Sequence, residues 1–164
     1  MALKVITFDA VPAVTREDPD WLRKQFGSFP SAIDLSLGRF PHIAEWPEAD
    51  SSKKYGVAWF EGETFPNWPA VDQRLSNEGY GPDRRTYPFH LATEVVPRLD
   101  ELWTKCQAGE GPRWIFASSP NAVWRHGGGR LYVPYVYVYP DYREVSAGWV
   151  EHDWFDFGFL VSCE

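Results

Sequence analysis

The alternation of apolar and polar positions divides the chain into short strands, a few helices and connecting loops. Strands are expected at 3–8, 31–37 and 55–60, where apolar residues alternate with polar ones or run together. Short helices are expected from about 18 to 27 and from about 67 to 79. Each of these begins with a capping Asp or Asn and an early proline, and each ends at a glycine.

The strongest helical pattern spans residues 93–107. Thr93 is the expected cap, and Pro97 is placed at the fourth helical position, where a backbone N–H would be unpaired in any case. The apolar positions recur at spacings of four, three and four residues, which is typical of one buried helix face. They are Val95, Leu99, Leu102 and Cys106.

After this helix the pattern changes to strands separated by short turns. The expected strands are 113–117, 122–125, 130–139, 144–150 and 154–162. Sequential strands with short connections usually pair antiparallel, so the sequence predicts a β-meander over about residues 113–162. Pro134 lies inside the longest strand and should mark a bulge or face an edge. The fold class predicted is α+β: one domain over residues 1–164, with two or three helices on one face of the C-terminal meander.

The last of these strands has two unequal faces. One face carries Phe155, Phe157, Phe159 and Val161, and the other carries Trp154, Asp156, Gly158 and Leu160. Burying Asp156 without a partner would be far more unfavourable than exposing Leu160. The Phe face is therefore expected to pack on the 93–107 helix. The Asp156 side is expected to be solvated, or reserved for a partner, and tolerant of Asp156→Ala.

Composition and charge narrow the classes of function. Aromatic residues make up 17% of the chain, and the net charge is −7 with a pI near 5.1. The acidic excess is spread over both halves, without a basic cluster of the kind that extended nucleic acids require. An acidic surface favours solubility, or attraction to a basic partner.

The termini and cysteines suggest a reducing, cytoplasmic environment. The N-terminal segment lacks the apolar stretch of a secretory signal, and no run of residues is long and apolar enough to span a membrane. Cys106 and Cys163 lack the spacing of a disulfide framework or a metal motif. Neither a metal nor another cofactor is expected.

The aromatic concentration supplies the first candidate site. Tyr and Trp suit binding surfaces because each combines an apolar ring with a polar group. The expected binding residues are Tyr135, Tyr137, Tyr139, Trp149, Trp154 and Asp156. Together with the negative charge, they predict a non-catalytic protein-binding module. An inhibitor or immunity-type protein that masks a basic site on another protein is the form expected.

The alternative is a small-ligand-binding protein, or an enzyme whose site is dispersed over several strands. A glycine run flanked by cations brings a backbone and positive charge together, as anion sites do. The residues concerned are Trp124, Arg125, His126 and Arg130, with Tyr135 and Trp149 as further walls of an aromatic-lined pocket. Ser118-Ser119 lacks the context of a nucleophile elbow, and Arg84-Arg85 is expected in a solvated loop. Whether the protein is an enzyme is left open.

Overall fold

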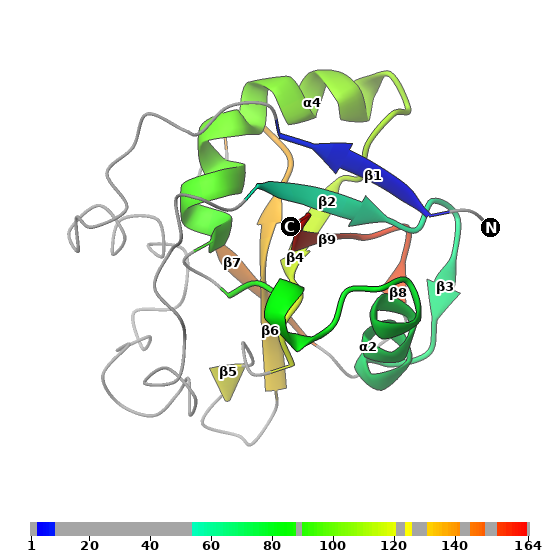
Figure 1. Cartoon of the computed structure of the whole chain (residues 1–164). Helices are drawn as coiled ribbons and strands as arrows, with labels where there is room; N and C mark the ends of the chain where they lie inside the picture. Colours follow the sequence, from blue (N-terminus) through cyan, green and yellow to red (C-terminus); the bar gives the residue numbers. More distant parts are fainter. Residues whose placement is uncertain are drawn as a thin grey trace.

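The protein has a mixed β-sheet with helices on both faces, an α+β arrangement (Figure 1). The computed structural model describes residues 3–8, 54–87, 90–120, 124–125, 131–141, 145–149 and 154–163. The expected helix at 18–27 and strand at 31–37 lie outside these residues. The strands are β1 (Lys4–Thr7), β2 (Tyr55–Trp59), β3 (Thr64–Phe65), β4 (Trp114–Ala117), β5 (Trp124–Arg125), β6 (Leu131–Tyr137), β7 (Ser146–Trp149), β8 (Trp154–Phe155) and β9 (Gly158–Ser162).

The main sheet has the order β1-β2-β9-β4-β6-β5, with β7 on the other edge of β6. The prediction of a purely antiparallel C-terminal meander is wrong at β9, which inserts between β2 and β4 and runs parallel to β4. The sequence gives strand positions but not partners, so adjacency along the chain was a poor guide here. The pairings of β6 with β4, β5 and β7 are antiparallel, as expected.

Pro134 lies where one edge of β6 changes partner. On that edge β4 ends its pairing opposite Tyr135, and β5 begins opposite Tyr132. Pro134 therefore falls between the two partners, at a point where a missing backbone donor is tolerated. Neither a bulge nor an outer edge strand is found at Pro134: β7 pairs in unbroken register through Ala147, and the gap lies between β4 and β5.

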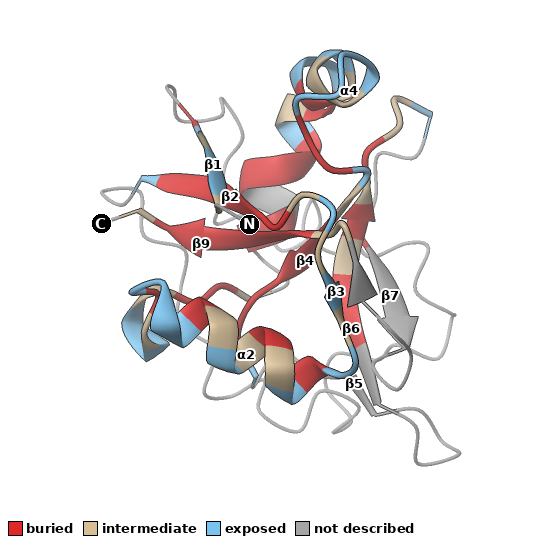
Figure 2. Cartoon of the chain, turned by 90° about the vertical axis from the view of Figure 1, so that its right-hand side faces the viewer, coloured by how far each residue is buried: buried red, intermediate tan, exposed pale blue. Residues whose placement is uncertain are grey.

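The helices cover both faces of the sheet rather than one, so the predicted one-sided arrangement is wrong. Figure 2 shows α4 (Leu99–Gln107) on one side of the sheet and α2 (Trp68–Asn77) on the other. We call the two apolar clusters between the layers the α4-side core and the α2-side core. The α4-side core includes Val57, Leu91, Val95, Leu99, Leu102, Ile115, Val136 and Leu160. The α2-side core includes Phe60, Trp68, Val71, Leu75, Phe116, Val133, Phe159 and Val161.

The predicted faces of the last strand are reversed. Leu160 lies in the α4-side core, and Phe159 lies in the α2-side core, 5.8 Å from Trp68 between ring centroids. Every residue of β9 is buried, as expected for a central strand covered on both faces. Alternation cannot orient such a strand, because both faces are apolar. The expected 154–162 strand is also broken at Asp156, whose φ of 56° separates β8 from β9.

Helix α2 forms as its sequence predicts. The side chain of Asn67 caps it, accepting a hydrogen bond from the backbone N–H of Ala70 at 2.9 Å. Gly79 follows the helix at a φ of +93°, a conformation that glycine adopts without strain. Val71 and Leu75 point inward and are fully buried.

The helix predicted at 93–107 begins earlier and is irregular. A π-helical turn, η3 (Leu91–Val95), is followed by a 3₁₀ turn, η4 (Val96–Arg98), and then by α4. Thr93 is therefore inside the helical segment rather than at its cap. Pro97 lacks the backbone N–H that an α-helical pattern would use at this point, which explains the change of pattern. Among the described residues, no helix is both long and apolar enough to cross a membrane.

Candidate functional site

The turn at Asp156 is held by three hydrogen bonds to the last residue of β2 and the segment that follows it. Its backbone N–H donates to the carbonyl of Glu63 at 3.1 Å. Its Oδ1 accepts from the indole N–H of Trp59 at 3.0 Å and from the backbone N–H of Gly62 at 2.8 Å. Both side-chain bonds converge on Oδ1, and Oδ2 has no partner in the part of the chain that the structure describes. The carboxylate is thus fixed in orientation with one oxygen still available.

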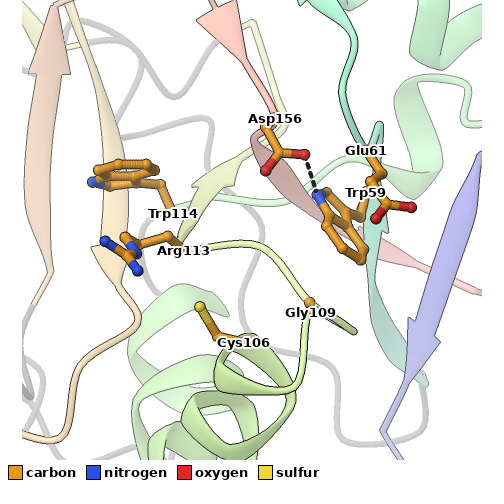
Figure 3. Close-up of a pocket in the computed structure, with 8 residues that line it drawn as sticks. Trp59, Glu61, Cys106, Gly109, Arg113, Trp114 and Asp156 are labelled. Atoms are coloured by element: carbon orange, nitrogen blue, oxygen red, sulfur yellow. Dashed lines mark hydrogen bonds between the residues drawn. The ribbon is translucent and has the colours of Figure 1, made fainter.

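Asp156 forms part of the wall of an open pocket of about 350 Å³. The other residues that line it are Trp59, Glu61, Cys106, Gly109, Gly111, Arg113 and Trp114. In Figure 3 the second carboxylate oxygen of Asp156 faces the space between Trp59 and Trp114, and the thiol of Cys106 approaches from α4. Three separate segments of the chain therefore build this site.

Glycines in the connection from α4 to β4 shape one side of the pocket. Gly109 ends the helix at a φ of +74°. Gly111 is buried, and an added Cβ there would lie 3.4 Å from both Ile6 Cδ1 and Lys105 Cβ. The chain therefore passes close to the sheet without filling the pocket with its own side chains.

The charges around the pocket are unequally partnered. Glu61 forms an ion pair with Lys4, whose ammonium also lies 5.3 Å from the centroid of the Trp59 ring. Arg113 is exposed, and in the described residues its guanidinium forms no ion pair. The pocket thus offers one fixed carboxylate, aromatic walls, a thiol and the exposed guanidinium of Arg113.

A line of aromatic rings continues from the pocket toward α4. Trp114 lies 5.6 Å from Tyr137, Tyr137 lies 6.2 Å from Tyr139, and Tyr139 meets Trp103 edge-on at 5.1 Å between ring centroids. We call these four residues the aromatic strip. All four are half-buried, so each presents part of its ring to the surface.

The predicted binding residues are only partly brought together. Tyr137 and Tyr139 belong to the aromatic strip, although Tyr139 lies beyond the end of β6 and packs on α4 through Trp103. Tyr135 lies 5.2 Å from Phe116 and packs against the α2-side core. Tyr135 and Tyr137 lie two residues apart on β6 and so share one face of the strand, and Tyr139 follows its end. That these three tyrosines form a binding ridge stays a prediction.

The remaining predicted binding residues do not belong to the aromatic strip. Trp149 pairs with Tyr132 at the other end of β6, and Trp154 pairs with Phe65 in the small β3–β8 sheet. Asp156 lines the pocket, but its hydrogen bonds show that this side is not simply solvated. Asp156→Ala is therefore expected to be destabilising, contrary to the prediction from strand alternation.

The residues of the alternative site lie at the far end of β6. Trp124 pairs with Tyr132, directly across from Trp149, and Arg125 pairs with Leu131. His126 and Arg130 lie outside the described residues. In the backbone register, Trp124 on β5 and Trp149 on β7 therefore flank Tyr132 of β6. They are well separated in register from the pocket at Trp114, which pairs with Tyr137.

Arg85 has an internal role, so the prediction of a solvated Arg84-Arg85 loop is wrong at this residue. Its guanidinium donates to the carbonyls of Tyr80 and Ser118 and to both the carbonyl and the carboxylate of Asp72. A fifth bond goes to Ser76 Oγ. These bonds join α2 to the end of β4, leaving Arg85 committed to the fold rather than to an external anion.

The serine that follows β4 is also used within the fold. Ser118 Oγ donates to the carbonyl of Leu160 at 2.6 Å and accepts from the backbone N–H of Thr86 at 2.9 Å. Ser118 is fully buried. This geometry supports a structural hydrogen-bond network and not an activated nucleophile.

Two residues with shifted pKa values, Tyr80 and Arg74, make contacts within the fold. Burial raises the pKa of Tyr80, since its ionised form would lie in an apolar environment. The pKa of Arg74 is also raised, first by its hydrogen bond to Glu78 and further by Glu63. Neither residue lines the pocket.

Sequence reasoning identified Asp156 and missed the rest of the pocket. Trp59, Arg113 and Trp114 carried no motif, and only the three-dimensional pairing of β2, β9 and β4 places them together. Within the described ranges, no group of three or more His, Cys, Asp or Glu side chains is arranged to hold a metal ion. Compared with protein-family models, with the curated proteins and with the solved structures, the chain matches none.

Proposed function

We propose that the protein is a binding module for another protein and that the aromatic strip is the centre of its interface. The observation that carries this proposal is the unbroken series of half-buried rings from Trp103 to Trp114. Trp and Tyr are enriched among the residues that dominate binding energy, because they bury large areas with little loss of conformational freedom.

The charge of the chain supports a basic partner. A net charge of −7 would attract a positively charged protein and would speed encounter, more strongly at low than at high salt. Masking of a basic site, as an inhibitor or immunity-type protein does, is the form of binding that fits both features. Ser118 and Arg85 both form hydrogen bonds within the fold, so we assign neither residue a catalytic role.

The test compares the wild-type chain with Trp103→Ala and with Val5→Ser as a matched control. Val5 is an exposed apolar residue on β1, away from the aromatic strip. Tagged wild-type protein is expected to retain a stoichiometric basic partner from extracts of its native source. Titration with that purified partner should then show affinity about tenfold or more weaker for Trp103→Ala and unchanged for Val5→Ser.

Two results would contradict the proposal. One is the failure to recover any stoichiometric partner. The other is equal affinity of the Trp103→Ala and Val5→Ser variants for the recovered protein. Circular dichroism of each variant shows whether the fold is retained, so that a loss of binding is not confused with unfolding.

A small-ligand-binding function is the second candidate, and the pocket is the observation that favours it. Its volume and its two indoles suit a small molecule with a polar group directed at Asp156. A thermal-shift screen of metabolites and nucleotides tests this function, since a bound ligand raises the unfolding temperature. The same shift in Asp156→Asn would place the ligand elsewhere.

A further inference from the structure

We propose that the pocket beside Asp156 binds the cationic head of a basic side chain, with a guanidinium as its best ligand. The inference rests on the proposed function in taking this side chain from the partner protein. It assigns the pocket a chemical specificity, which the aromatic strip by itself does not supply.

The fixed carboxylate of Asp156 is the first element of the argument. Trp59 and Gly62 both donate to Oδ1, so the carboxylate cannot rotate freely, and Oδ2 is left toward the pocket. A carboxylate accepts several hydrogen bonds, and an ionised acceptor forms its strongest bonds with a cationic donor. The fold therefore already holds the Asp156 carboxylate in place before a ligand binds.

The aromatic walls are the second element. Trp114 is half-buried, whereas Trp59 is buried beside the carboxylate that it orients and already has the Lys4 ammonium over its ring. Indoles attract cations through the negative charge of their ring faces, and a planar guanidinium also stacks on them. A fixed carboxylate in a pocket that the half-buried Trp114 also lines is better suited to an arginine side chain than to an anion.

The chain itself holds a cation at this corner, which is the third element. The Lys4 ammonium lies over the Trp59 ring and pairs with Glu61, another residue of the pocket wall. Lys4 thus neutralises Glu61 but leaves Asp156 without a cationic partner in the described residues. A second cation would complete the arrangement.

Arg113 gives the inference a prediction of definite sign. Its exposed guanidinium is the positively charged group among the residues that line the pocket, and it repels an incoming cation. Replacing it by glutamine should therefore strengthen the binding of a cation. The same change should weaken the binding of an anion, or of a zwitterion whose carboxylate pairs with Arg113.

The experiment titrates the full chain with N-acetyl-L-arginine amide, whose only charge is the guanidinium. The indole ¹H–¹⁵N resonance of Trp59, assigned with Trp59→Phe, reports binding next to Asp156. A cation held by one carboxylate in an open pocket is expected to bind in the millimolar range. N-acetyl-L-citrulline amide is the matched neutral ligand and should give no saturable shift.

Three protein variants complete the test. Asp156→Asn keeps an oxygen for Trp59 and Gly62 and tolerates the positive φ, so it should fold while binding about tenfold or more weakly. Arg113→Gln should bind more tightly than wild type. Val5→Ser, at an exposed position that does not line the pocket, should bind the capped arginine as wild type does.

The inference is overturned if the citrulline derivative binds as well as the arginine derivative, or if Asp156→Asn leaves the affinity unchanged. Two other results would also overturn the inference: weaker binding of the capped arginine by Arg113→Gln, or tighter binding of free arginine than of its capped form. Either result would assign the pocket to a zwitterionic small molecule. The titration involves no partner protein. Saturable binding of the capped arginine without any recoverable partner would therefore refute the proposed function and leave the cation specificity standing.

Discussion

Replacement of Arg85 by methionine should be among the most destabilising single changes in the described part of the chain. Methionine retains much of the apolar stem but supplies none of the five hydrogen bonds. The side chain of Arg85 is 3% exposed, whereas that of its ion-pair partner Asp72 is 39% exposed. Water can therefore rehydrate the Asp72 carboxylate but not the carbonyls of Tyr80 and Ser118, whose bonds to Arg85 are buried.

The magnitude follows from those two carbonyls. Leaving a buried acceptor unpaired costs about 1–3 kcal/mol, so the pair gives about 2–6 kcal/mol. We expect Arg85→Met to lower the free energy of unfolding by about 3–5 kcal/mol, a large part of the ~5–15 kcal/mol that a domain has.

Urea denaturation followed by far-ultraviolet circular dichroism measures this change. Arg84→Met is the matched control, because Arg84 is the neighbouring arginine and none of the five bonds involves it. Its effect should stay within about 0.5 kcal/mol. A loss below about 1 kcal/mol for Arg85→Met, or equal losses for the two variants, would refute the reasoning that buried carbonyls depend on this guanidinium.

Three further outcomes are expected. Phe159→Ala should destabilise by about 3–5 kcal/mol in the same assay, since the ring is fully buried in the α2-side core; a loss below about 1 kcal/mol would contradict that placement. Asp156→Ala should destabilise by about 1.5–3 kcal/mol and Asp156→Asn by less than about 1 kcal/mol, because only asparagine keeps the acceptor; equal losses would count against the two hydrogen bonds. Because burial raises the pKa of Tyr80, its contribution to the free energy of unfolding should be complete below about pH 10, the pKa of the unfolded chain, and should be lost as the pH rises through the folded pKa. Urea denaturation should show a smaller loss of stability at alkaline pH for Tyr80→Phe than for wild type, and identical pH profiles would refute the shift.

Local sequence signals predicted the local elements well. Asn67 and Gly79 bound α2 as expected, because a cap and a positive-φ glycine act over a few residues. The apolar face formed by Val95, Leu99 and Leu102 is also confirmed, although an irregular turn separates Val95 from the α-helix that carries the other two. These features depend on near neighbours, which a single sequence contains in full.

Pairing and orientation could not be read in the same way. The run from Phe157 to Val161 is apolar at nearly every position, so its period does not say which face meets which helix. The insertion of β9 beside β4 depends on contacts between distant segments and leaves no periodic signal. For the same reason, the sequence pointed to Asp156 alone among the pocket residues, since Trp59 and Trp114 reach the pocket from other strands.

The position of β9 also affects how fast the chain can fold. Tyr55 pairs with Ser162, so the chain must close a loop of roughly a hundred residues before the centre of the sheet exists. Loop closure of this kind opposes folding until the contacts that follow it are made, and a high contact order slows folding. During synthesis, β2 and β4 emerge well before the strand that joins them. Their apolar edges stay exposed until β9 arrives, which makes this interval the stage most open to aggregation or chaperone binding.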